Sequence, residues 1–259
     1  MNILFIGDIV GSQGRAIVQS LLPVYKEKYN IDVVIANAEN AAHGKGITPK
    51  IATHLFEIGV DVITMGNHAY AKRDVYDIDE NAAIVFPGNM SGSLSHKHTY
   101  VLEKNGVYLA ISNVYGSVFM DNVDHNPFDL MQTILCEVEA HAHIVDFHGE
   151  ATAEKQAFLH YFKEDVSAII GTHTHIQTAD EDVFDGCAYI SDVGMCGPYE
   201  SILGRDIEEA LAKVVENKTT HYKPSKKPAI FNAVVITLDE YYRSSAIKRI
   251  SVRPTEKAH

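Results

Sequence analysis

The sequence predicts a mixed α/β sandwich in which helices lie outside packed β-sheets. Strand-like and helix-like segments alternate through the first half of the chain, and paired strand-like segments follow towards its end. This mixture is typical of layered α/β folds. The proline-containing stretch 223–228 is the best candidate for a linker, but the tail after it is too short to be a domain. We therefore expect residues 1–259 to form a single domain.

Short apolar runs and helix-opening residues account for the first half of the chain. Ser12 is the expected cap of the first helix, and Thr48-Pro49 opens the second, because Pro suits the first helical position. The expected elements are a strand at 2–7, a helix from 12 to about 29, a strand at 31–36, a helix from 49 to about 58, a strand at 60–65 and a polar helix near 73–81.

The second half begins with a hairpin. Asn105-Gly106 between two apolar runs is a strong signal for a tight turn, and Asn126-Pro127 then opens a helix. The expected elements are strands at 100–104 and 107–113, a helix from 127 to about 139, a strand at 143–147, a helix at 152–162, a strand at 166–170, short strands around 188–190, a helix at 205–217 and a terminal hairpin of 229–238 and 246–252.

Composition excludes several classes of partner. The 259 residues include 22 Lys and Arg and 34 Asp and Glu, so the formal net charge is −12. A chain this acidic is a poor binder of duplex DNA or of an anionic membrane surface. No apolar run approaches the ~18 residues of a membrane span. Three cysteines without a C-x-x-C pair indicate a reducing compartment, so we expect a cytoplasmic protein.

Polar side chains follow five of the predicted strands, at the point where each strand ends. Ligands of open α/β sheets bind at the carboxyl ends of strands, so these side chains can converge on one site. Carboxylate, amide and imidazole groups are typical metal ligands. The clusters contain Asp8, Glu39 with Asn40, Asn67 with His68, His148, and His173 with His175.

Each of these residues alone has a simpler explanation. Asp8 could cap a helix, Asn67 could belong to a turn, and His148 could be a satisfied core histidine. The coincidence of five clusters at strand ends favours a shared site instead. The His-Lys-His segment at 96–98 and the His-Ala-His segment at 141–143 precede strands, and we interpret both as solvated histidines.

In combination the motifs resemble the calcineurin-like metallophosphoesterases, and the match to their YmdB-like bacterial phosphodiesterase subgroup is closer. The subgroup's motifs are similar to Gly7-Asp8-Ile9-Val10-Gly11, Asn37-Ala38-Glu39-Asn40 and Asp192-Val193-Gly194-Met195-Cys196-Gly197-Pro198. Val10 stands where the broad family has a His, and Glu39 where it has a bridging Asp; both departures agree with the subgroup. The implied fold is a metallophosphoesterase-like sandwich of two mixed β-sheets flanked by helices.

The resemblance also implies ligands for two divalent or trivalent metal ions. Asp8, Glu39, Asn40 and His175 would hold one ion, and Glu39, Asn67, His148 and His173 the other, so that Glu39 bridges. Nitrogen and oxygen ligands suit iron or manganese, with zinc or cobalt as alternatives. Two ions would attract a phosphate and lower the pKa of a bridging water. His68, next to a ligand, is the best candidate for the general acid.

The implied enzyme is a metal-dependent phosphodiesterase that hydrolyses small phosphodiesters by attack of a metal-activated hydroxide. The expected substrates are 2′,3′-cyclic nucleotides first and 3′,5′-cyclic AMP second, and the expected assembly is a homo-oligomer. A phosphomonoesterase or nuclease on the same site, and a nucleotide-sensing regulatory protein, are the alternatives. Arg15, in the first turn of a predicted helix, could contact a phosphate, but we interpret it as a solvated side chain. Cys196 has no evident base, so we interpret it as a pocket or packing residue.

Overall fold

The structure, a computed structural model, describes residues 1–92 and 97–254. One sheet contains β1 (Asn2–Ile6), β2 (Asp8–Ile9), β3 (Val33–Asn37), β4 (Val62–Thr64), β5 (Ile84–Val85), β12 (Met195–Pro198), β13 (Ala229–Leu238) and β14 (Ser244–Val252). The other contains β6 (Thr99–Lys104), β7 (Val107–Tyr115), β8 (Ala142–His148), β9 (Ala168–Thr172), β10 (Asp182–Phe184) and β11 (Cys187–Ile190). The helices are α1 (Gly11–Lys28), α2 (Pro49–Glu57), the 3-10 helix η1 (Arg73–Asp77), α3 (Pro127–Glu137), α4 (Thr152–Phe162) and α5 (Ile207–Val214).

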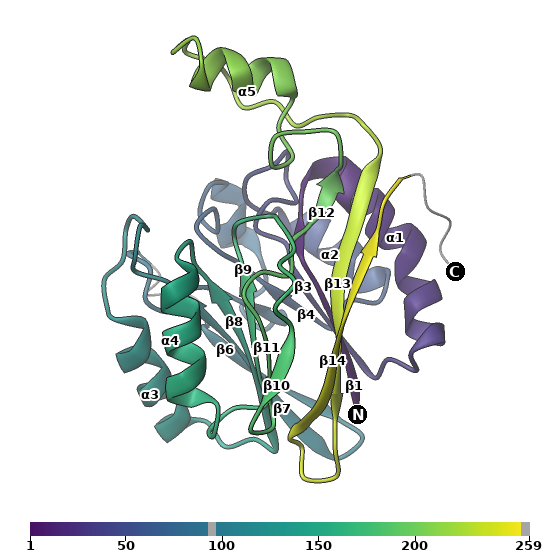
Figure 1. Cartoon of the computed structure of the whole chain (residues 1–259), viewed down its shortest axis with the longest axis vertical. Helices are drawn as coiled ribbons and strands as arrows, with labels where there is room; N and C mark the ends of the chain where they lie inside the picture. The colour runs from purple at the N-terminus through teal and green to yellow at the C-terminus, as the bar shows by residue number, and fades with distance from the viewer. Residues whose placement is uncertain (93–96, 255–259) are drawn as a thin grey trace.

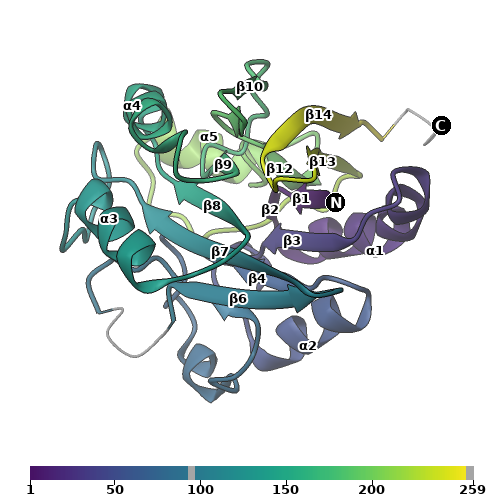
Figure 2. The same cartoon turned by 90° about the horizontal axis from the view of Figure 1, so that it is seen from below.

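The two sheets pack face to face, and helices cover the outer face of each (Figure 1 and Figure 2). The eight-stranded sheet has the order β2-β12-β13-β1-β3-β4-β5, with β14 paired to β13, and the six-stranded sheet has the order β10-β11-β9-β8-β7-β6. Each contains parallel and antiparallel pairs. The predicted sandwich of two mixed sheets flanked by helices is therefore confirmed.

The core consists of three apolar layers, which follow from the alternation of side chains along the strands. In β1, Leu4 and Ile6 pack in the layer under α1 and α2, whereas Ile3 and Phe5 pack between the sheets. The third layer joins the six-stranded sheet to α3 and α4. Each fully buried side chain of this kind contributes about 1.5–3 kcal/mol relative to its exposed state. The packed sheets thus hold the strand ends rigidly beside one another.

Helix starts were predicted with mixed success. Thr48 and Asn126 cap α2 and α3, as predicted, by accepting hydrogen bonds from backbone N–H groups. Ser12 does not cap α1: the helix already begins at Gly11, and Val10 occupies the cap position without a side-chain bond. The polar helix expected near 73–81 is the short 3-10 helix η1.

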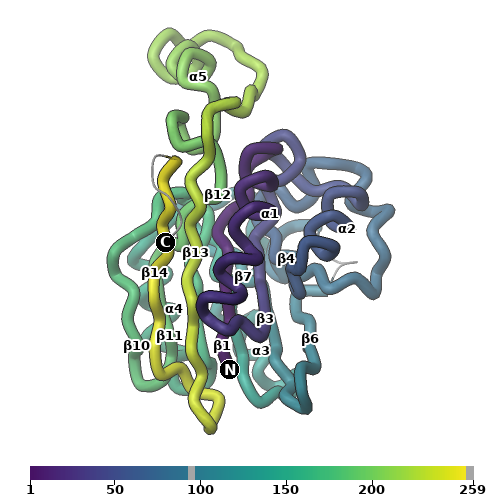
Figure 3. Tube along the Cα trace, turned by 90° about the vertical axis from the view of Figure 1, so that its right-hand side faces the viewer, coloured from purple at the N-terminus to yellow at the C-terminus, as the bar shows by residue number. Residues whose placement is uncertain are grey.

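Four short strands, β2, β5, β10 and β12, were not predicted, because two to four residues carry no periodic pattern. The segment that holds α5 projects from the body beyond the ends of β12 and β13, as Figure 1 and Figure 3 show. We call residues 199–228 the arm. Within the described residues, the search for a helix long and apolar enough to span a membrane finds none.

Candidate metal centre

All seven predicted metal ligands lie together at the carboxyl ends of strands from both sheets. Asp8 follows β1, and the side chains after β3 and β4 come from the same sheet, whereas those at the ends of β8 and β9 come from the other. Asp8 and His148 are fully buried, and Glu39 is nearly so. The junction between the sheets therefore brings residues far apart in sequence to one place, although their binding of metal stays a prediction.

Two triplets of possible ligand atoms share Glu39. The ligand atoms of Glu39, His148 and His173 lie within 4.8 Å of one another, and so do those of Asp8, Glu39 and His175. These triplets match the two predicted ligand sets, with Glu39 in the bridging place.

The two amide side chains complete the sets. Asn40 Oδ1 lies 3.2 Å from His175 Nε2. The terminal atom of the Asn67 amide lies 3.0 Å from His148 Nε2 and 3.2 Å from each carboxylate oxygen of Glu39. With its nitrogen at that position the Asn67 amide would donate to these acceptors, whereas with its oxygen there a cation would have to lie between them.

A buried relay orients His148. Thr172 Oγ1 donates to Asp146 Oδ1 at 2.6 Å, so it can only accept from His148 Nδ1, which lies 2.8 Å away. The Nδ1 proton leaves Nε2 with a lone pair directed into the cluster. Such outer partners fix the tautomer of metal-binding histidines.

His173 and His175 are oriented by other groups. His175 Nδ1 lies 3.1 Å from the carbonyl oxygen of Leu203, which can only accept, so His175 Nε2 is left for the cluster. His173 directs Nε2 to Glu150 at 3.2 Å and Nδ1 to the cluster. Both histidines have positive φ, 106° and 68°, a conformation that costs free energy and clusters at functional sites.

The electrostatics of the cluster fit metal ions. Asp8 Oδ1 is buried without a hydrogen-bond partner among the described residues. Burial, and after it the neighbouring carboxylates, raise the pKa of Asp8 well above its ordinary value. Burial also lowers the pKa of each of the three histidines, which keeps them in the neutral form that binds metal.

Glu39 stays ionised in this setting. Burial raises the pKa of Glu39, but the hydrogen bonds that its carboxylate accepts from His68 favour the ionised form and help hold that pKa below its ordinary value. The backbone N–H of His68 donates to Glu39 Oε2 at 2.8 Å. A cation would relieve the repulsion between the two carboxylates and satisfy the orphaned oxygen of Asp8.

His68 is held beside Glu39 but is no member of either triplet. Its Nδ1 lies 3.3 Å from Glu39 Oε1 and 3.3 Å from the amide nitrogen of Asn40. The ring is partly exposed, with 26% of the side chain accessible, and it lines the cavity above the cluster. With Nδ1 engaged, Nε2 is free to meet a substrate.

The loop after β11 supports the centre from behind. The carbonyl of Gly194 accepts from Asp8 N at 3.0 Å, and Asp192 accepts from Thr174 N at 2.8 Å. Lys155, buried, pairs with Asp192 at 3.3 Å. Cys196 lies in β12, fully buried with its thiol directed to the Asn232 carbonyl, which agrees with its interpretation as a packing residue.

An open cavity of about 230 Å³ covers the cluster. Leu203 and Tyr222 of the arm form part of its wall, and Tyr222 lies against Gly44, where a Cβ atom would collide with its ring. Gly66 has a similar role beside the candidate ligands, since a Cβ there would collide with His148 and Glu39. Both glycines therefore allow a close approach that other residues would block.

Sequence reasoning missed the supporting residues. Asp146 shares a face of β8 with His148, because the two are two residues apart, and this spacing could have revealed it. Thr172, Lys155 and Tyr222 left no comparable local signal, since their partners are distant in sequence.

The interpretation of the histidines in the segments 96–98 and 141–143 as solvated is only partly correct. His143 is buried, and its Nε2 lies 2.7 Å from Ser112 Oγ, because β8 already begins at Ala142. His141 is exposed and stacks on Tyr108. His98 is half-buried, and His96 lies outside the described residues.

Comparisons with known proteins identify the family of the chain. A family model described as YmdB-like protein matches residues 4–250. The chain is 40% identical over 257 residues to a protein of Bacillus subtilis (strain 168) named 2′,3′-cyclic-nucleotide 2′-phosphodiesterase, and the match covers 97% of each chain.

Two solved structures are similar over nearly the whole chain. One, described as a novel phosphatase of Mycoplasma pneumoniae, has a TM-score of 0.92 and 36% identity and covers 97% of this chain and 93% of that one. The other, a hypothetical protein from Thermus thermophilus, has a TM-score of 0.92 and 37% identity and covers 97% and 99%. The predicted resemblance is confirmed, the chain is an enzyme as predicted, and it belongs to the YmdB-like protein family.

Proposed function

We propose that the protein is a dinuclear metal-dependent phosphodiesterase for small nucleotide-type diesters. The observation that carries the proposal is the shared Glu39, which belongs to both triplets of possible ligands. The name of the Bacillus subtilis relative supports 2′,3′-cyclic nucleotides as the first substrate class. We place 3′,5′-cyclic AMP second.

The proposed ions are iron or manganese, held by the seven side chains Asp8, Glu39, Asn40, Asn67, His148, His173 and His175. When bound, two such ions would neutralise phosphate charge and lower the pKa of a water. The chain's own task is to hold the ligands in register. Thr172 and the Leu203 carbonyl keep one bare imidazole nitrogen of His148 and His175 directed inward.

His68 supplies the proton in this proposal. When the ring carries a proton on both nitrogens, Nδ1–H donates to Glu39 and Nε2 can give its proton to the departing oxygen of the substrate. A sugar alkoxide is a poor leaving group and needs that proton. His68 thus has a role distinct from that of the ligands around it.

The cavity favours a diester over a monoester. Among the described residues, its lining contains neither Lys nor Arg. A dianionic monoester would lack a cationic side chain to balance its second charge, whereas a monoanionic diester would not need one. The phosphomonoesterase alternative therefore has less support from the site.

The test combines metal analysis of the purified protein with a matched pair of substrates. We expect two metal equivalents per chain and faster hydrolysis of bis-p-nitrophenyl phosphate than of p-nitrophenyl phosphate. One equivalent in fully loaded protein would contradict the dinuclear site, and a preference for the monoester would reverse the substrate class. Binding of cyclic nucleotide without metal-dependent turnover would favour the sensor alternative. A cytoplasmic location and a homo-oligomer stay predictions.

A further inference from the structure

A second cavity lies beside the candidate metal centre and has a different chemical character. Its volume is about 560 Å³. The residues that line it come from α1, the loop after β3, α2 and the start of η1: Arg15, Ala42, His43, Thr48, Lys50, Ile51, His54, Lys72 and Asp74.

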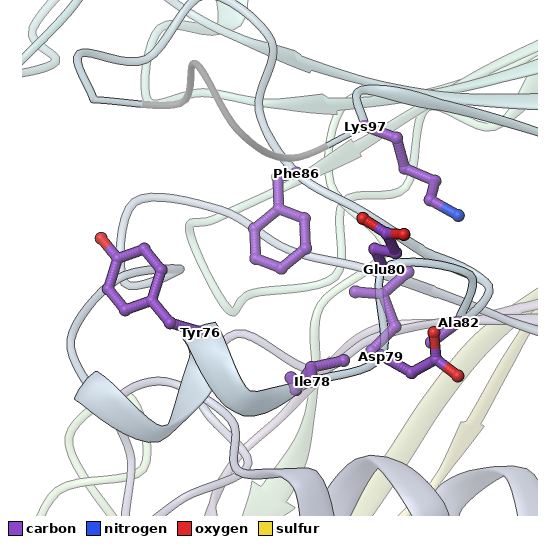
Figure 4. Close-up of a pocket in the computed structure, with 8 residues that line it drawn as sticks. Tyr76, Ile78, Asp79, Glu80, Ala82, Phe86 and Lys97 are labelled. Carbon is purple, nitrogen blue, oxygen red and sulfur yellow. The ribbon is translucent and has the colours of Figure 1, made fainter.

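The lining is basic in a chain whose net charge is −12. It contains three permanent cations, Arg15, Lys50 and Lys72, and two histidines against the single carboxylate of Asp74. Within residues 1–92 and 97–254, no carboxylate lies within 4.0 Å of any of the three cations. Another cavity, whose lining includes Tyr76 of η1, is not basic: it contains the carboxylates of Asp79 and Glu80 and the single cation of Lys97 (Figure 4). A basic lining is therefore no general property of the cavities of this protein.

Arg15 is the central feature of the basic cavity. The sequence-based interpretation of Arg15 as a solvated side chain is only partly correct, because the residue is half-buried. Its guanidinium donates to the carbonyl of Ala41, which uses part of its five N–H donors. Burial lowers the pKa of Arg15, and no acid offsets that cost. An anion would supply the missing partner.

The same two loops form both cavities. The loop after β3 contributes Asn40 and Gly44 to the metal cavity and Ala42 and His43 to the basic one. The loop after β4 contributes Asn67 and His68 to the metal cavity and Lys72 to the basic one, and Asp74 follows in η1. A ligand that reaches from one cavity into the other would therefore cross these loops.

The start of α2 also lies at the basic cavity. Thr48, which caps this nine-residue helix, and Lys50 in its first turn both line the cavity. In its first turn Pro49 has no N–H and the N–H of Ile51 donates to Thr48 Oγ1, so the helix start offers the N–H of Lys50 and the positive end of the helix dipole. The helix start thus adds to the side-chain cations and favours a compact anion.

We propose that the basic cavity is a second phosphate site, which takes a phosphate group of a nucleotide-type ligand in addition to the diester at the metal centre. This inference rests on the proposed function only where it takes a nucleotide-type substrate as the molecule that bears the phosphate. The phosphate either belongs to the substrate itself, as in a 5′-phosphorylated 2′,3′-cyclic nucleotide, or is a separate orthophosphate.

The main experiment measures KM and kcat of the full chain for 2′,3′-cyclic AMP and for its 5′-phosphorylated form. Wild type should show a KM about tenfold lower for the 5′-phosphorylated substrate, the size of one charge-assisted contact. The double variant Lys50→Gln/Lys72→Gln should lose that preference. The control Lys213→Gln/Lys248→Gln removes the same charge on α5 and β14 and should keep it.

Titration with orthophosphate distinguishes the two sources. If wild type binds more phosphate than Lys50→Gln/Lys72→Gln but prefers neither substrate, the site holds a separate anion and the proposal stands. Equal phosphate binding by both proteins, together with equal KM values, would overturn it. If neither substrate is hydrolysed, the proposed function fails, and the phosphate titration alone decides on the second site.

Discussion

The two halves of the candidate metal centre are held in different ways. In the buried half, Thr172 orients His148, and both residues have no exposed surface. In the arm-side half, the orienting group of His175 is the carbonyl of Leu203, a residue that is 45% exposed and has a φ of 51°. The orientation of His148 thus depends on the packed sheet, whereas that of His175 depends on the conformation of the arm.

The difference indicates that the halves need not bind metal equally well. A ligand set fixed by a rigid sheet is preorganised, which favours tight binding. A set that relies on an exposed loop must first order that loop. We therefore expect the buried half to bind its ion more tightly, and the variants below test the comparison, starting with the largest effect.

Glu39→Gln should abolish the difference by disabling both halves. The bridging side chain loses its charge, so the affinity for both metal equivalents should fall by more than the ~10–100-fold expected when a residue that only orients a ligand is replaced. Elemental analysis and turnover check this outcome. The matched control is Glu103→Gln, at an exposed carboxylate of β6 that belongs to neither triplet. Retention of one full equivalent by Glu39→Gln would show that Glu39 serves one half only.

His68→Ala should leave both metal ions bound and slow only the chemical step. The expected loss of kcat with a cyclic nucleotide is ~10²–10⁴-fold, about 3–5 kcal/mol, because the alkoxide departs without a proton. With a nitrophenolate leaving group the loss should be much smaller. Equal losses of kcat on both substrates at full metal content would exclude His68 as the general acid. Loss of metal from the variant would instead show that His68 contributes to metal binding.

The contrast between the halves also marks what the sequence could predict. The seven candidate ligands follow strands, so local patterns could predict that they converge, whereas their assignment to two metal ions rests on the resemblance and stays a prediction. The layered fold followed from the alternation of strands and helices. Thr172 could not be assigned its relay, because Asp146 and His148 approach it only through the pairing of β8 with β9. Leu203 could not be placed, since an exposed leucine in a loop carries no local sign that its carbonyl faces His175.

Thr172→Val should weaken the buried half alone. Valine keeps the shape of threonine but cannot accept from His148 Nδ1, so the imidazole loses its fixed tautomer. We expect ~10–100-fold weaker binding of one metal equivalent, measured by titration with manganese. Thr53→Val, at an exposed position of α2, is the control. Equal weakening of both equivalents would mean that the halves are not separable.

The smallest effect should come from the arm, and a pair of variants at Leu203 isolates it. Leu203→Gly keeps the carbonyl, and glycine adopts a φ of 51° at no steric cost, so the orientation of His175 should survive. Leu203→Val places a β-branched residue in the same conformation, which valine adopts less readily than leucine. The arm should then shift, and the more weakly bound equivalent should lose roughly fivefold in affinity. Because both variants remove the leucine side chain from the cavity wall, equal metal affinities would show that the backbone of Leu203 does not position His175, and the two halves would then be equally independent of the arm.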